Sequence, residues 1–94
     1  MSDLVAQHAS ISGKVQGVWY RAWTQKKARA LGLKGWVRNR SDGSVEAVFC
    51  GTPEQLKQMA MACRKGPPLA NVMGVELTDT DIPDEDDFEL RETC

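Results

Sequence analysis

The stretch GKVQGVWYR, residues 13–21, connects a segment that alternates between apolar and polar residues to a segment with helical spacing. Gly13 and Gly17 permit turns that other residues resist, and Arg21 falls where a helix is expected to begin. Backbone N–H groups in such a turn can converge on one point, and the first N–H groups of a helix lack partners within it. An anion held there would meet amide donors, the positive end of the helix dipole and the guanidinium of Arg21. The stretch therefore predicts an oxyanion-binding loop, with phosphate as the expected ligand; an ordinary strand-to-helix loop with a solvated Arg21 is the alternative.

The segments on either side of this loop have clear periodicity. A strand is predicted over residues 5–12 and a helix over residues 22–31, ended by Gly32 in a left-handed cap. On the strand, Val5, Gln7, Ala9 and Ile11 point to one face, and His8, Ser10 and Ser12 to the other. We expect the second face to be open to solvent, with His8 as a solvated sheet residue.

The remaining chain alternates strand and helix signals. Strands are predicted over residues 34–40, 45–50 and 72–78, with an Asp-Gly hairpin turn at residues 41–44 and Met73, Val75 and Leu77 facing inward. A second helix begins at Thr52 with a capping box completed by Gln55, and it ends at Gly66. An acidic loop over residues 79–87 precedes a short final strand at Phe88 and Leu90. Its spacing is not that of a calcium loop, so we expect it to be solvated.

This order of elements predicts an α+β fold, a ferredoxin-like βαββαβ sandwich. Its mostly antiparallel sheet would carry two helices on one face, plus a short extra C-terminal strand. RNA-binding domains share the architecture, but they place aromatic residues on the central strands of the open face. The corresponding positions here are His8, Ser10, Ser12, Glu46, Val48 and Cys50. The sequence therefore disfavours nucleic acid as a partner.

Length and composition narrow the class of protein further. A chain of 94 residues with ordinary apolar and charged content predicts one domain, residues 1–94. No segment approaches the roughly 20 apolar residues of a membrane span, and residues 1–7 lack the features of a signal peptide, so we expect a cytoplasmic protein. Cys50, Cys63 and Cys94 are far apart and odd in number, which predicts free thiols rather than disulfides or a zinc site. With His8 as the single histidine, no metal site is expected.

Charge is distributed unevenly along the chain. Residues 1–40 hold eight Lys/Arg and one acid, a balance of +7, whereas residues 41–94 hold four and twelve, a balance of −8. This asymmetry favours a small anionic ligand near the first half, because the acidic second half would repel a nucleic-acid backbone.

The second segment that bears on chemistry is Trp36–Asn39. A serine–histidine–acid set, a metal cluster and a Walker loop cannot be assembled from this sequence. If the strand over residues 34–40 pairs beside the first strand, Asn39 comes near the mouth of the loop. Its amide offers both a donor and an acceptor, so it can hold a water molecule without titrating. A structural role in the turn is the alternative.

The two segments together resemble the signatures of the acylphosphatase family. The first signature corresponds to Gly13–Arg21 with Thr24, the second to Gly35–Glu46, and the resemblance extends over essentially the whole chain. It implies the ferredoxin-like fold, Arg21 and Asn39 as the essential residues, and a phosphate-binding loop formed by Gln16, Gly17, Val18, Trp19, Tyr20 and Arg21. Tyr20 departs from the Phe that is common in the family, and its hydroxyl needs a hydrogen-bond partner.

The resemblance also implies an activity: metal-free and cofactor-free hydrolysis of an acyl phosphate to a carboxylate and phosphate. The loop amides and Arg21 would hold the phosphoryl oxygens, and Asn39 would orient water. A non-catalytic anion-binding or regulatory module of the same fold is the alternative. We expect a monomer that binds small acyl phosphates and inorganic phosphate. Trp19, Arg38 and Arg40 either border a pocket for the acyl group or belong to the plain surface.

Overall fold

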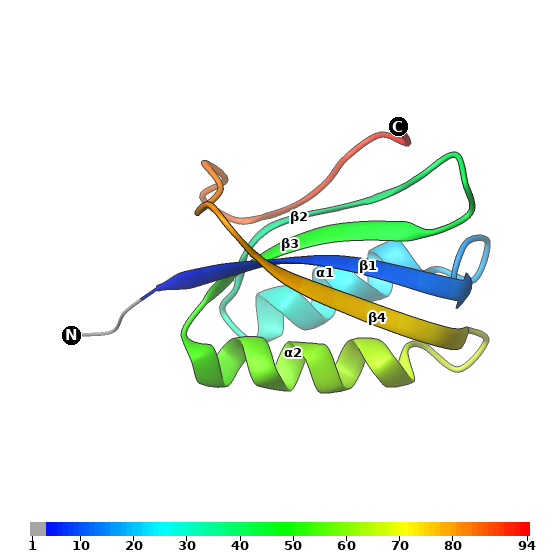
Figure 1. Cartoon of the computed structure of the whole chain (residues 1–94), viewed down its shortest axis with the longest axis horizontal. Coiled ribbons are helices and arrows are strands. Elements are labelled where there is room, and N and C mark those ends of the chain that lie inside the picture. The colour runs from blue at the N-terminus through cyan, green and yellow to red at the C-terminus, as the bar shows by residue number, and fades with distance from the viewer. Residues whose placement is uncertain (1–3) are drawn as a thin grey trace.

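A computed structural model describes residues 4–94 of the chain. The elements are β1 (Val5–Lys14), α1 (Tyr20–Ala30), β2 (Lys34–Asn39), β3 (Val45–Gly51), α2 (Pro53–Lys65), β4 (Asn71–Thr80) and β5 (Phe88–Leu90). The strands form one sheet in the order β4-β1-β3-β2-β5, and both helices lie on the same face of it (Figure 1). Neighbouring strands are antiparallel except β2 and β5, which are parallel. The predicted ferredoxin-like α+β sandwich with an extra C-terminal strand is confirmed.

The position of β2 differs from the expectation. It does not pair beside β1, because β3 lies between the two and pairs with both. The reason is that the β1–α1–β2 and β3–α2–β4 units interleave in the sheet. β3 lies between the parallel strands β1 and β2, and β1 lies between the parallel strands β3 and β4. The loop after β1 therefore passes over β3 before α1 begins.

The core lies between the sheet and the helices. Tyr20, Thr24 and Ala28 of α1 are buried there, and so are four residues of α2: Leu56, Met59, Ala60 and Cys63. From the sheet, Phe49 and Phe88 stack with ring centroids 5.4 Å apart, which fixes β5 to the core although it is only three residues long.

A β-bulge changes the predicted ends and faces of two strands. The pairing of β1 with β4 shifts between Ser12 and Gly13, and β1 continues to Lys14 rather than ending at Ser12. Gly13 has φ 115°, and a Cβ there would lie 2.2 Å from the carbonyl oxygen of Asn71, so only glycine fits. The extra residue on β4 is Met73, which is 82% exposed. Its predicted inward orientation is wrong; Val72 packs against the core instead.

The helix ends follow the sequence signals more closely. At α2, the Thr52 hydroxyl accepts from the Gln55 N–H at 3.2 Å, and the Gln55 side chain accepts from the Thr52 N–H at 2.8 Å, which completes the predicted capping box. At the end of α1, Gly32 has φ 77°, and Leu33 N–H donates to the Ala28 carbonyl, so the predicted left-handed cap is present. The start of α1 is two residues earlier than predicted, at Tyr20.

Candidate active site

The segment between β1 and α1 is a five-residue loop, residues 15–19. Gly17 has φ 73° and Trp19 φ 65°, and Trp19 is the only non-glycine residue of the described chain with positive φ. Trp19 is the N-cap of α1 but provides no side-chain cap, and the first helical hydrogen bond is donated by Trp23. Among residues 4–94, no acceptor is found for the backbone N–H groups of residues 17–22. The loop therefore ends in a set of unsatisfied amide donors at the positive end of α1.

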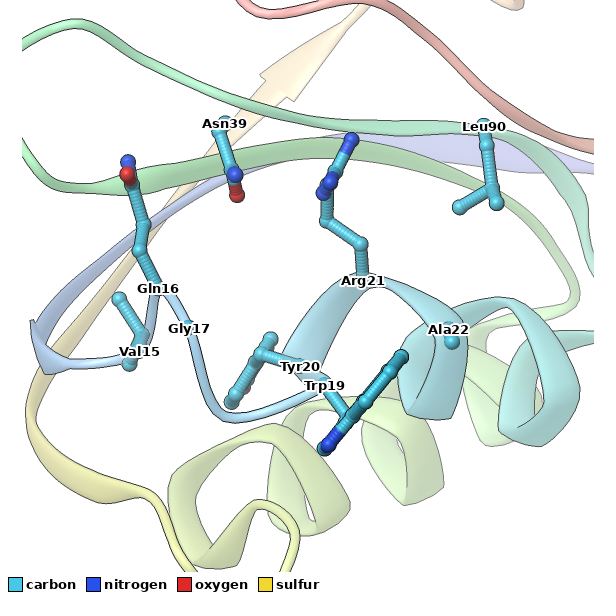
Figure 2. Close-up of a pocket in the computed structure, with 9 residues that line it drawn as sticks. All are labelled: Val15, Gln16, Gly17, Trp19, Tyr20, Arg21, Ala22, Asn39 and Leu90. Carbon is cyan, nitrogen blue, oxygen red and sulfur yellow. The ribbon is translucent and has the colours of Figure 1, made fainter.

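Arg21 is the second residue of α1, and its side chain extends from the helix toward the sheet (Figure 2). Within the described residues it has no carboxylate partner, whereas Arg29, Arg38, Arg40 and Arg91 all form ion pairs. A guanidinium that is partly buried, unpaired and beside free amides is well suited to a tetrahedral oxyanion.

Asn39 is the last residue of β2, and it lies on the helix-covered face together with Val37, two residues earlier. Its side-chain amide makes no hydrogen bond to another described residue and is partly exposed. Asn39 and Arg21 line one pocket of about 430 Å³, shown in Figure 2. The other residues that line it are Val15, Gln16, Gly17, Trp19, Tyr20, Ala22 and Leu90.

The pocket contains most of the predicted site. Val18 is the exception, because its side chain is 5% exposed and belongs to the core, so Val18 can contribute only its backbone. Leu90 is an addition that sequence reasoning missed: it was assigned to the final strand, but its position at the pocket depends on the pairing of β5 with β2.

The side chain of Gln16 ties the loop to the hairpin that follows Asn39. Its amide nitrogen donates to the carbonyl oxygens of Arg40 at 2.7 Å and Ser44 at 2.8 Å. Both donor hydrogens of the side chain are thus used within the protein. Gln16 therefore contributes to the site mainly by fixing the loop relative to the strand that carries Asn39.

The C-terminal segment contacts β2, the strand that carries Asn39, on the edge opposite β3. After β5 it runs along β2, where Cys94 N–H donates to the Asn39 carbonyl at 3.2 Å and Ser41 N–H donates to the Cys94 carbonyl at 2.9 Å. The backbone around Asn39 is therefore held by Gln16 of the loop and by Cys94 of the C-terminal segment, while the side-chain carboxamide of Asn39 stays free.

Tyr20 has the hydrogen-bond partner that its hydroxyl was expected to need. The hydroxyl donates to the carbonyl oxygen of Cys63 at 2.7 Å, inside the core. Burial raises the pKa of Tyr20 well above its usual value, and burial likewise raises the pKa of the Cys63 thiol to about 11. Both groups are therefore neutral at physiological pH, and they act as packing groups beneath the loop.

Arg38 and Arg40 do not border the pocket. Successive residues of a strand point to opposite faces, so these two flank Asn39 but lie on the face away from the helices. There Arg38 Nε donates to Glu46 Oε1 at 2.6 Å and Arg40 Nη2 to Glu46 Oε2 at 2.9 Å. His8 Nε2 is 2.6 Å from Glu46 Oε2, so the expectation of a simply solvated His8 is wrong.

Glu46 is at the centre of this cluster, with a side chain only 11% exposed. Burial by itself raises the pKa of its carboxyl group, but hydrogen bonds from Arg40, His8 and Arg38 outweigh that effect and hold the pKa at about 2. The carboxylate is therefore charged at all physiological pH values, and it joins β1, β2 and β3 behind the pocket.

The helix-free face is less open than predicted. Ala6, Trp36, Val48 and Cys50 form a small buried cluster there, and the guanidinium of Arg91 lies 4.4 Å from the Trp36 ring centroid. Trp36 is 8% exposed, so it offers no stacking platform for a base.

Within residues 4–94, no group of three His, Cys, Asp or Glu side chains is arranged to hold a metal ion. In the same residues, neither helix has the length and apolar character needed to cross a membrane.

Comparison with known proteins adds three findings. A family model of acylphosphatases matches residues 7–90. The chain is 55% identical over 81 residues to an acylphosphatase of Rhodospirillum rubrum, covering 86% of this chain and 89% of the relative, and 45% identical over 93 residues to one of Azoarcus sp., covering 99% and 95%. Among solved structures, an acylphosphatase from Coxiella burnetii has a TM-score of 0.91 and 39% identity, over 95% of this chain and 94% of that one. The comparisons agree with one another over almost the whole chain.

Proposed function

The chain belongs to the acylphosphatase family and hydrolyses acyl phosphates, and we propose that Arg21 and the loop amides bind the phosphoryl group while Asn39 positions the attacking water. One observation carries this assignment: an unpaired guanidinium, a set of unsatisfied amides and a free carboxamide line the same pocket. The alternative, a non-catalytic module of the same fold, has no support among these relatives, which are named acylphosphatases.

In the proposed reaction, water attacks phosphorus, the bond from phosphorus to the acyl oxygen breaks, and a carboxylate leaves. The proton lost by water passes to an oxygen of the substrate's own phosphate. The carboxylate is a good leaving group, so a strong protein acid or base is not required. The protein contributes position and charge stabilisation, which is the main contribution of proteins to phosphoryl transfer generally.

Arg21 and the unsatisfied amides of residues 17–21 stabilise the charge that spreads over the phosphoryl oxygens in the transition state. These donors are fixed before substrate arrives, since the loop is held by Gln16 at one end and by α1 at the other. Loss of a single preorganised donor of this kind typically lowers turnover by about 10²–10³.

Asn39 orients the attacking water through its carboxamide, which accepts from and donates to one water molecule without changing protonation. Its contribution is the alignment of the water with phosphorus, which is a matter of position rather than proton transfer. In this mechanism neither Arg21 nor Asn39 gives up or accepts a proton, so no protein group acts as an acid or a base.

We also propose that residues 1–94 act as one monomeric, cytoplasmic domain that needs no metal and does not bind nucleic acid. The uneven charge supports a small anionic substrate, because the acidic second half disfavours a polyanion. The burial of Trp36 also argues against nucleic-acid binding, because its ring is not available to stack on a base.

The test compares hydrolysis of benzoyl phosphate, in the presence of a metal chelator, by the wild type, Arg21→Ala and Arg64→Ala. Arg64 is the matched control, an arginine of α2 with no ion pair in the described chain and no place at the pocket. We expect chelator-resistant turnover in the wild type and Arg64→Ala, and a loss of about 10² or more in Arg21→Ala together with loss of inhibition by phosphate. Unchanged activity in Arg21→Ala would refute the assignment.

A further inference from the structure

The two parts of the proposed site are attached to strands that are not neighbours. β1 leads into the loop that is followed by Arg21, whereas β2 ends at Asn39. β3 lies between these two strands and pairs with both, so β1 and β2 do not pair with each other. The position of Asn39 relative to the loop therefore depends on contacts that reach across β3. The side chain of Gln16 provides one of them.

The side chain of Arg40 provides a second contact of this kind, on the helix-free face of the sheet. Arg40 follows Asn39 directly in the chain, and its guanidinium reaches over β3 to β1. There Nη1 donates to the Ser10 hydroxyl at 3.3 Å, and Nη2 lies 3.4 Å from His8 Nε2. On β3 itself, Glu46 Oε2 accepts from Nη2 at 2.9 Å. Arg40 thus connects the end of β2 with β3 and β1.

Glu46 holds the Arg40 guanidinium in place. The Glu46 side chain is 11% exposed and that of Arg40 is 27% exposed, so water competes only in part for this charge-assisted hydrogen bond. Successive residues of an extended chain point to opposite faces. Fixing Arg40 on the helix-free face therefore keeps the carboxamide of Asn39 on the other face, where the pocket lies.

Arg38 allows a close comparison with Arg40, because it flanks Asn39 on the other side. It donates to the second oxygen of Glu46 at 2.6 Å, and its side chain is 28% exposed. Its further contact is with Trp36 of its own strand, whose ring centroid lies 4.7 Å from the guanidinium carbon. In the described chain, Arg38 makes no hydrogen bond to β1. The two arginines carry the same charge beside Asn39, but only Arg40 is connected to β1.

We propose that Arg40 is a positioning residue: held by Glu46 and connected to β1, it fixes Asn39 relative to the phosphoryl group. The proposal rests on the assignment of Asn39 made above. Arg40 does not line the pocket, so its effect on turnover passes through Asn39. A misplacement of about 1 Å in such a site can lower the rate by about 10², and a loosened Asn39 should cost less than that.

The experiment measures kcat for benzoyl phosphate and the inhibition constant of inorganic phosphate in the wild type, Arg40→Met and Arg38→Met. Methionine keeps much of the apolar stem of each arginine and removes its charge. We expect kcat to fall by about tenfold in Arg40→Met and by less than about twofold in Arg38→Met. Phosphate inhibition should change by less than about twofold in both variants, because the groups that bind phosphate are not altered.

Two further variants separate positioning from a general loss of structure. In Asn39→Ala the water is no longer oriented, so adding Arg40→Met should lower kcat no further. Ser10→Ala removes only the hydroxyl that accepts from Arg40, and it serves as a milder test if Arg40→Met does not fold. We expect Ser10→Ala to lower kcat by about two- to threefold, as for the loss of one hydrogen bond, with unchanged phosphate inhibition.

Wild-type kcat in Arg40→Met would overturn the proposal, and so would an equal loss in Arg38→Met, which would mark an effect of charge rather than of the connection to β1. A tenfold loss on adding Arg40→Met to Asn39→Ala would show that Arg40 does not act through Asn39 and would overturn it as well. Failure of the underlying assignment is seen separately, as unchanged kcat in Asn39→Ala alone. The two failures are therefore distinguishable in one set of assays.

Discussion

Replacement of Glu46 by Gln removes the charge that joins three strands behind the pocket. The carboxylate accepts hydrogen bonds from Arg38 at 2.6 Å and Arg40 at 2.9 Å and contacts His8 at 2.6 Å. These contacts lower its pKa from 4.5 to about 2 in the folded protein. Since one pKa unit corresponds to about 1.4 kcal/mol, the shift represents about 3 kcal/mol, and partial solvent screening of the two arginines reduces this to about 2 kcal/mol.

The sign of the pH dependence follows from the direction of the shift. Between pH 4.5 and 2 the unfolded chain binds a proton at Glu46 that the folded protein does not, so stability falls as pH falls through that range. The contribution of Glu46 is fully present above about pH 5 and is lost near pH 2. Glu46→Gln lacks this contribution at every pH.

The assay is urea unfolding of the wild type, Glu46→Gln and Glu76→Gln between pH 2.5 and 7. Glu76 is the control, an exposed glutamate of β4 without an ion pair in the described chain. At pH 7 we expect Glu46→Gln to be less stable by about 2 kcal/mol, equivalent to roughly 10 °C in Tm, and the difference to shrink as pH approaches 2. A wild-type advantage that stays constant with pH would refute the electrostatic explanation.

Three further predictions concern the site. Arg21→Lys keeps the positive charge but loses the bidentate fork, so we expect weaker inhibition by phosphate and turnover reduced by about 10² or more in steady-state assays; wild-type kinetics would contradict the role of the fork. Gly17→Val places a β-branched residue at φ 73°, and because the added Cβ would meet no other atom, backbone strain is its only expected effect. We expect this strain to lower the free energy of unfolding by about 1–3 kcal/mol, as measured by urea unfolding, and to weaken inhibition by phosphate. An unaffected variant would exclude that strain. The rate of benzoyl phosphate hydrolysis should vary little between pH 6 and 8, because the proposed mechanism uses no protein group as an acid or a base. A bell-shaped profile that disappears on mutation of a protein group would argue for acid–base catalysis instead.

Much of the fold was predictable because local signals and periodicity agree. The capping box at Thr52 and the glycine cap at Gly32 depend on contacts between residues a few positions apart, and both are present. The inward orientation of Met73 failed for a non-local reason. The bulge in the β1–β4 ladder depends on the partner strand at Ser12 and Gly13, and strict alternation within β4 contains no sign of it.

The candidate site shows the same division between local and long-range information. Arg21, Asn39 and the loop were predicted from motifs, and the structure places Arg21 and Asn39 in one pocket. Leu90 was not predicted as a pocket residue, because its position depends on a parallel pairing between β2 and β5, some 50 residues apart. A role for Glu46 was missed for a related reason: an alternating strand shows which face a residue takes, but not which charges the neighbouring strands bring to it.

The most direct test of the central claim separates binding from catalysis at Asn39. It measures kcat for benzoyl phosphate and the inhibition constant of inorganic phosphate in the wild type, Asn39→Ala and Asn71→Ala, with Asn71 as an exposed asparagine outside the pocket. We predict that Asn39→Ala loses about 10² or more in kcat while phosphate inhibition changes little, and that Asn71→Ala resembles the wild type. Equal loss of turnover and phosphate affinity in Asn39→Ala, or unchanged turnover, would contradict the division of roles between Arg21 and Asn39.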